Sequence, residues 1–221
     1  MSADRPAATQ EQRTWSLTDL VQRAAALQRQ GGRTLLGITG APGAGKSTVA
    51  GAIVQALEGR ALLVPMDGFH LADAVLDELG RRDRKGAPDT FDAAGFVHLL
   101  RRVRDRDDEV VYAPVFVREQ EQAVAGALAV PRGVPLVVVE GNYLLLDEGP
   151  FAEVRALLTE TWYLDLDPDT RVQRLVARHM QHGRSATAAQ HWVADTDEPN
   201  ARLIEGTRSR ADLAVRLGPA S

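Results

Sequence analysis

The feature that most constrains this chain is the octapeptide Gly40-Ala41-Pro42-Gly43-Ala44-Gly45-Lys46-Ser47, which Thr48 follows. It fits the pattern G-x-x-x-x-G-K-[ST] at every fixed position, between an apolar run and a helical pattern. Glycines let backbone N–H groups converge on a phosphate, and the positive N-terminal end of the following helix adds to the attraction. The sequence therefore predicts that residues 40–48 cradle the phosphates of a nucleotide.

The two side chains that close this loop predict the cofactors ATP and Mg²⁺. Lys46 can bridge phosphate oxygens, and the hydroxyl of Ser47 can bind Mg²⁺. Lys46 and Lys85 are the only lysines among many arginines, so a lysine at this position does not follow from background composition.

Four apolar runs of strand length alternate with helical patterns along the chain. This alternation predicts an α/β fold with a parallel sheet, helices on both faces and ligands beyond the carboxyl ends of the strands. The expected strands are residues 34–39, 61–66, 136–139 and 161–166.

A carboxylate follows two of these expected strands. Asp67 comes directly after residues 61–66, where it could accept the proton of an attacking hydroxyl group, although Asp67-Gly68 is also a common turn pair. Glu140 follows residues 136–139, where it could hold Mg²⁺ or share in proton transfer, or could merely cap the strand. Both carboxylates should lie on the same rim as the phosphate loop.

Composition limits the classes of protein that this chain can be. Hydrophobic residues make up 44% and charged residues 25%, which is typical of one globular domain. The net charge of −4 offers no basic patch for nucleic acid, so we expect no nucleic-acid partner. The absence of cysteine and of a signal-like apolar start predicts a cytoplasmic protein. Apolar runs are shorter than the roughly 20 residues that a membrane helix needs, so no membrane partner is expected.

Other segments have weaker patterns. A helix capped by Ser16 is expected within residues 1–32, a leader segment ahead of the main domain at 33–221. The charged residues 80–88 form either a solvated loop or a mobile substrate loop. Residues 110–130 suggest an irregular hairpin. Few large aliphatic residues follow the arginine-rich helix expected at 169–182, so residues at about 178–197 have the profile of a lid.

Four further motifs give the chain a family resemblance. The motifs are P-M-D-G-F-H at 65–70, K-G-A-P-D-T-F-D at 85–92, Y-A-P-V-F at 112–116 and V-E-G-N-Y-L-L-L at 139–146. Together with the phosphate loop they resemble the phosphoribulokinase, uridine kinase and pantothenate kinase superfamily, in the nucleoside/nucleotide kinase-like branch that includes fructokinases.

The resemblance implies a fold and a set of binding residues. The fold is that of P-loop NTPases, a five-stranded parallel sheet flanked by helices, with a helical lid. Asp89 is similar to an aspartate that contacts ribose hydroxyls, while His70 and Tyr112 fall in segments that line the acceptor pocket. A helix-start histidine and an edge-strand tyrosine are the structural alternatives for these two. Arg178 and Arg184 lie where the family's lid supplies positive charge to ATP.

The resemblance also implies a reaction. Asp67 matches the catalytic aspartate, and Glu140 matches a glutamate near magnesium. We therefore expect an ATP-dependent kinase that transfers the γ-phosphate to a hydroxyl group of a small metabolite, a sugar or a nucleoside-like acceptor. The segment around Val117 lacks a histidine and an aspartate of relatives, which argues against a pyrimidine base. The resemblance also admits a homodimer.

Two other functions remain open from the residues alone. One is a nucleotide-hydrolysing switch or regulatory ATP-binding protein that needs no acceptor, although the chain has no N-K-x-D segment for guanine. The other is a degenerate kinase used as a scaffold, against which the intact set of Lys46, Ser47, Asp67 and Glu140 argues.

Overall fold

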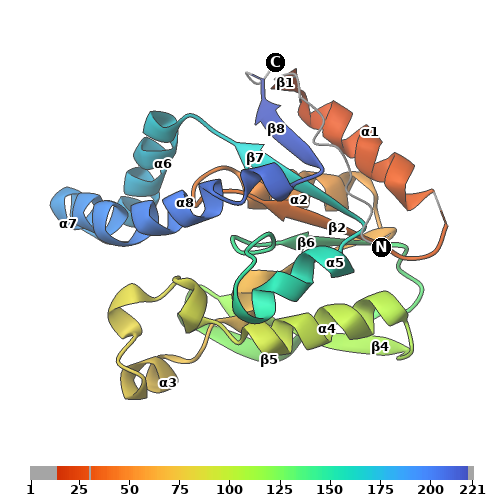
Figure 1. Ribbon diagram of the computed structural model, residues 1–221, viewed down its shortest axis with the longest axis horizontal. Coiled ribbons are helices and arrows are strands. Elements are labelled where there is room, and N and C mark those ends of the chain that lie inside the picture. The colour runs from red at the N-terminus through yellow and green to blue at the C-terminus, as the bar shows by residue number, and fades with distance from the viewer. Residues whose placement is uncertain (1–13, 30, 219–221) are drawn as a thin grey trace.

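A parallel six-stranded sheet forms the centre of the computed structural model, which describes residues 14–29 and 31–218 (Figure 1). The strand order is β1-β8-β7-β2-β6-β3, and β2 pairs with β6 on one side and with β7 on the other. The strands predicted from apolar runs are confirmed. The bounds are β1 (Thr14–Trp15), β2 (Thr34–Thr39), β3 (Ala61–Pro65), β6 (Leu136–Glu140), β7 (Glu160–Asp165) and β8 (Leu213–Leu217).

The prediction of five strands is wrong by one, because β1 adds an edge strand among the described residues. β1 pairs in parallel with β8, with Thr14 opposite Arg216 and Trp15 opposite Leu217. A two-residue strand is too short to produce a hydropathy pattern, so only tertiary pairing reveals it. The leader residues 1–13 lie outside the described part of the chain.

Helices cover both faces of the sheet. The helix predicted after Ser16 is confirmed as α1, and it begins with a capping box in which Ser16 Oγ accepts from the Asp19 N–H at 3.0 Å. α1 and α2 pack on one face with Leu36, and α4 and α5 pack on the other face with Leu35. The helices are α1 (Leu17–Gln28), α2 (Lys46–Ala56), α3 (Asp73–Glu78), α4 (Ala93–Asp105) and α5 (Val154–Leu157).

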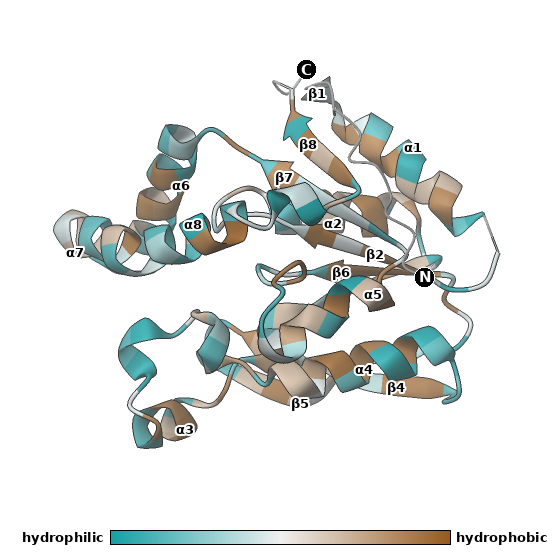
Figure 2. Ribbon diagram, in the orientation of Figure 1, coloured by the Kyte–Doolittle hydropathy of each residue, from teal (hydrophilic) through white to brown (hydrophobic). Residues whose placement is uncertain are grey.

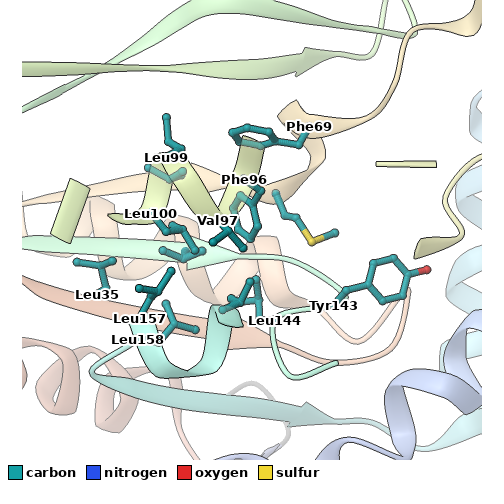
Figure 3. Packing of buried hydrophobic residues seen from close by; sticks show 14 of the residues in the cluster. Leu35, Phe69, Phe96, Val97, Leu99, Leu100, Tyr143, Leu144, Leu157 and Leu158 are labelled. Atoms are coloured by element: carbon teal, nitrogen blue, oxygen red, sulfur yellow. The ribbon is translucent and has the colours of Figure 1, made fainter. Parts of the chain in front are cut away.

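The two faces bury separate apolar cores. Figure 2 shows that the central strands β2 and β6 are mostly hydrophobic, as strands buried on both faces must be. On the α4 face, Phe96 and Leu100 pack against Leu35, Leu144 and Leu157 (Figure 3). These side chains are almost completely removed from water, so this packing holds the strand ends in place beside the loops that follow them.

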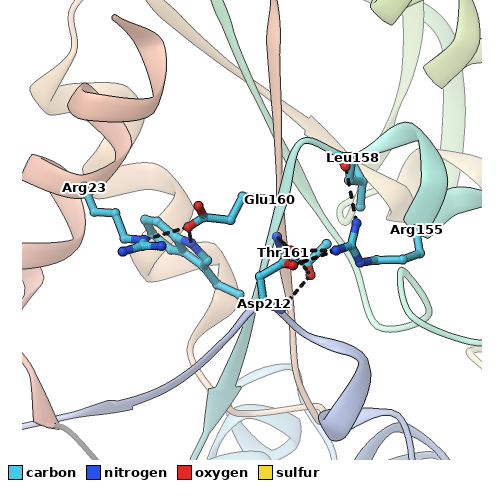
Figure 4. A network of polar contacts seen from close by, with 7 residues as sticks. Arg23, Arg155, Leu158, Glu160, Thr161 and Asp212 are labelled. Carbon is cyan, nitrogen blue, oxygen red and sulfur yellow. Dashed lines mark hydrogen bonds and ion pairs between the residues drawn. The ribbon is translucent and has the colours of Figure 1, made fainter. Parts of the chain in front are cut away.

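A polar network fixes the start of β7 against β8 (Figure 4). Asp212 accepts hydrogen bonds from Arg155 Nη2 at 2.7 Å and from the Thr161 N–H at 2.8 Å. Arg23 of α1 pairs with Glu160 at 2.6 Å. Because charged groups take part in each contact, these hydrogen bonds are of the stronger kind, and they tie the first helix to the same strand.

The remaining elements surround the carboxyl ends of the strands. The predicted hairpin is confirmed as β4 (Val110–Val117) and β5 (Gln122–Pro131), which pair antiparallel. At the left of Figure 1 lie α6 (Pro168–Gln181), α7 (Ala186–Trp192) and α8 (Glu198–Glu205), and a turn of π-helix (Val193–Asp197) joins α7 to α8. In the described ranges, we find no helix with the length and apolar character that crossing a membrane requires.

Candidate active site

The phosphate loop joins the central strand β2 to α2. Gly43 and Gly45 have φ values of 82° and 95°, a region that glycine adopts without a steric cost. A Cβ atom at Gly43 would lie 3.0 Å from Leu175 Cγ and 3.2 Å from Arg171 Cγ, so α6 packs directly against the loop. The sequence thus places glycine where the backbone must turn and where α6 approaches it.

Lys46 lies at the start of α2 with its ammonium group folded onto the loop. Nζ donates to the carbonyl oxygen of Gly40 at 2.8 Å and to that of Ala41 at 3.2 Å. The side chain is buried, and this burial lowers the pKa of Lys46, while the charges of Glu140 and Asp67 raise it. Lys46 Nζ is the only charged nitrogen of the loop. It is bonded to the loop backbone, and the charges of two carboxylates act on it.

Ser47 of α2 is bonded to Glu140, the last residue of β6. In the sheet register, Glu140 stands beside Ile38 of β2 and beside Pro65 of β3, so three strand ends meet at this point. Ser47 Oγ donates to Glu140 Oε2 at 3.3 Å. Burial raises the pKa of Glu140, and the charge of Lys46 opposes this. A hydroxyl and a carboxylate oxygen are ligands that suit Mg²⁺, so these two residues fit the metal that an ATP-binding loop requires.

Asp67 lies in the 3-10 turn Met66–Phe69 that directly follows β3. Its carboxylate makes no hydrogen bond or ion pair with the rest of the described chain. Its charge nevertheless acts on Lys46, Glu140 and Arg178. A carboxylate that is close to the phosphate loop and not bonded to the protein is available to accept a proton.

His70 and Asp89 lie beside this turn. His70 Nδ1 is 2.9 Å from the Asp67 carbonyl oxygen, and the imidazole ring lies 4.0 Å from the Phe91 ring. Burial lowers the pKa of His70. Asp89 is exposed and accepts from Arg84 Nη2 at 2.6 Å, a hydrogen bond that lowers the pKa of Asp89. The carboxylate of Asp89, which the resemblance assigns to substrate hydroxyls, is thus bound by Arg84 of the charged loop 80–88 in this structure.

Tyr112 lies on the outer face of β4. Its side chain is 61% exposed, whereas its neighbours Val111 and Ala113 are buried against α4. It makes no polar or ring contact with another candidate residue in the described ranges. The structure therefore does not bring Tyr112 together with Asp67 and Lys46.

The two arginines expected to contact ATP differ in their placement. Arg178 is half-buried in α6; burial lowers its pKa, and the charges of Asp197, Asp67 and Glu140 raise it. Arg184 is exposed and lies over the Trp192 ring, with 4.0 Å between Cζ and the ring centroid. The structure brings the charge of Arg178 within range of the site carboxylates and leaves Arg184 stacked on Trp192.

Tyr143 is a residue of the site that sequence reasoning missed. It lies three residues after Glu140, in a motif noted only for that glutamate. Its side chain is 1% exposed, and its hydroxyl donates to the Gly86 carbonyl oxygen at 2.5 Å. Burial, followed by the charge of Asp67, raises the pKa of Tyr143. The loop 80–88 is thus anchored to the core beside the site.

We expect Tyr143→Phe to raise the KM for the phosphate acceptor by roughly 2- to 10-fold, because a net contribution of about 0.5–1.5 kcal/mol is lost with the hydrogen bond to the loop. Steady-state kinetics at saturating ATP measure this. Tyr163→Phe is the matched control, because Tyr163 is equally buried and its hydroxyl has no hydrogen-bond partner in the described residues. Equal changes in both variants would contradict an anchoring role.

The fold and the site define a class of protein. A phosphate loop after the central strand, a lysine within it and carboxylates at the adjacent strand ends are the parts of a P-loop phosphotransferase. The model of the phosphoribulokinase/uridine kinase family matches residues 35–221. The chain belongs to this family, and it is an ATP-dependent phosphotransferase that acts on small molecules.

Individual relatives agree with this assignment. The chain is 33% identical to the uncharacterized protein YggC of Escherichia coli strain K12, over 84% of this chain and 78% of YggC. It is 30% identical to a pantothenate kinase of Enterococcus faecalis, over 82% of this chain and 67% of that kinase. A crystal structure from Silicibacter sp. TM1040, provisionally named as a fructose transport system kinase, is 37% identical and superposes with a TM-score of 0.80, covering 90% of this chain and 98% of that one.

Proposed function

We propose that this enzyme transfers the γ-phosphate of ATP to a hydroxyl group of a sugar or nucleoside-like acceptor, and that Asp67 is the general base. The observation that supports this most is the position of Asp67. Its carboxylate has no bonded partner in the described chain, yet its charge acts on Lys46 of the phosphate loop. A base so placed can remove the proton of a hydroxyl that approaches the γ-phosphate.

The other residues have electrostatic roles. Lys46 and Arg178 supply positive charge for the phosphoryl group as negative charge spreads over its oxygens. Mg²⁺, held by Ser47 and Glu140, would neutralise charge between the phosphates when it is bound. Because phosphoryl transfer needs little covalent help from the protein, positioning and charge account for most of this catalysis.

The loop at 80–92 and the names of relatives support this class of acceptor. Asp89 lies in the P-D-T-F-D segment, and its carboxylate is exposed. Relatives of this chain bear names that refer to a fructose transport system kinase, a uridine kinase and a pantothenate kinase. Fructose, uridine and pantothenate each have several hydroxyl groups, including a primary alcohol.

The deciding experiment measures ADP release from Mg-ATP across sugars, nucleosides and pantothenate, with Asp67→Asn in parallel. We expect release that depends on one class of acceptor and that is lost in the variant. ADP release independent of every acceptor would instead identify a hydrolytic switch, and ATP binding without any turnover in the panel would favour a scaffold.

A further inference from the structure

We propose that the acceptor carries a carboxylate or phosphate group and that Arg118 binds this group. The inference rests on the proposed kinase function and names the acceptor more narrowly, as an anionic hydroxy compound such as a sugar acid or a sugar phosphate. Arg118 lies at the turn between β4 and β5.

The β4–β5 hairpin is held firmly against the turn that carries Asp67. A Cβ atom at Gly68 would collide with the Pro114 carbonyl oxygen, so the backbone of β4 lies directly against this turn. Two residues before Arg118, the Phe116 ring lies 5.0 Å from the His70 ring. Arg118 directly follows Val117, the last residue of β4, so it lies at the end of the strand that packs on the Asp67 turn.

The turn of the hairpin, at residues 118–121, is also anchored. Lys85 Nζ donates to the Glu121 carbonyl oxygen at 2.8 Å and to Asp73 Oδ1 at 2.7 Å. The same ammonium group lies 5.2 Å from the Phe116 ring centroid. The charged loop 80–88 therefore fixes both sides of the turn at 118–121, and Arg118 projects from a supported position.

The guanidinium group of Arg118 has no partner among the described residues. It is exposed and forms no hydrogen bond or ion pair within the described ranges. The nearby cations differ from it, because Arg82 and Arg84 pair with Asp77 and Asp89 and Lys85 pairs with Asp73. An arginine without a carboxylate beside it, on a surface where its neighbours are neutralised, is free to pair with a ligand.

Arg118 also lies within electrostatic reach of the reacting groups. Burial raises the pKa of Glu140, and the charge of Arg118, after that of Lys46, opposes this. Burial lowers the pKa of Arg178, and Arg118 lowers it further. The charges of Arg118 and Arg178 thus both act on Glu140, the first from the hairpin and the second from α6.

The position of the hairpin points to the acceptor rather than to ATP. The phosphate loop follows β2, and α6 packs on its Gly43, so the lid side of the sheet serves the nucleotide. The hairpin packs instead on the turn after β3, the edge strand at the other end of the sheet. A planar guanidinium forms paired hydrogen bonds with a carboxylate or a phosphate, which makes Arg118 a suitable contact for either group.

The test compares matched pairs of acceptors. Fructose, ribose and glycerol are each assayed beside an anionic counterpart, namely fructose 6-phosphate, ribose 5-phosphate and glycerate, so that phosphates and carboxylates form separate arms. We expect kcat/KM to be about tenfold or more higher for the anionic member of at least one pair. Arg118→Gln should abolish this preference by raising the KM for the acceptor, with the KM for ATP unchanged, and Arg118→Lys should retain part of it.

Arg29→Gln, at an exposed arginine that follows α1, is the matched control for loss of a surface charge. Neutral and anionic acceptors used equally well, by the wild type and by Arg118→Gln, would overturn the inference while leaving the kinase function intact. A change in the KM for ATP alone would assign Arg118 to the nucleotide and would also overturn it. ADP release that no acceptor stimulates would instead count against the kinase function itself.

Discussion

Replacing Asp67 by asparagine is expected to lower kcat by about 10²- to 10⁴-fold, the usual contribution of general acid–base catalysis, with the KM for ATP nearly unchanged. Asparagine has almost the same shape as aspartate but cannot accept the proton of the attacking hydroxyl. The Asp67 carboxylate has no hydrogen bond or ion pair to lose within the described chain, so the fold should tolerate the change. Initial rates of acceptor phosphorylation and ATP titrations separate the two effects.

Asp77→Asn is the control for this prediction. Asp77 is an exposed carboxylate on α3, in the same part of the chain, and it pairs only with Arg82 at 3.0 Å. Its replacement should leave kcat within about twofold of wild type, because an exposed ion pair contributes little. A kcat close to wild type in Asp67→Asn would show that Asp67 orients the acceptor or forms a turn, and that another group accepts the proton.

The parts of the site that sequence predicts best are those fixed by local chain geometry. The phosphate loop is contiguous, so its glycines and Lys46 identify it without any knowledge of the fold. Asp67 and Glu140 lie far apart in sequence, but Glu140 ends the parallel strand β6 and Asp67 follows its neighbour β3. Because such strand ends share one edge of a sheet, the pattern was sufficient to place both carboxylates beside the loop.

Residues whose position depends on distant packing could not be predicted in this way. Tyr112 lies in a motif that resembles an acceptor pocket, yet the pairing of β4 with β5 turns its side chain outward. Arg184 is near a glycine hinge in sequence, but an aromatic ring eight residues further on holds it. Arg118 reaches the site only because the hairpin packs on the Asp67 turn, a contact that no periodicity encodes.

Replacing Lys46 is expected to impair both binding and catalysis. Lys46→Met should lower kcat/KM for ATP by about 10²- to 10³-fold, the effect of removing one preorganised positive donor from a transition state. Methionine keeps the length and the apolar stem of lysine. Because burial disfavours the charge of Lys46, as the lowered pKa indicates, its removal should not lower Tm in the absence of nucleotide. Lost activity with an unchanged Tm would then be a functional effect.

The composition of the chain makes this prediction unusually easy to control. Lys85 is the only other lysine, so Lys85→Met is the matched variant, and amine-directed labelling with mass spectrometry reports on just two lysine side chains. Mg-ATP should protect Lys46 from the label and leave Lys85 reactive. Lys85→Met should retain the KM for ATP, because its ammonium group contacts Asp73 and the hairpin rather than the phosphate loop. Protection of Lys85 alone, or equal loss of ATP binding in both variants, would show that the nucleotide does not bind at the phosphate loop.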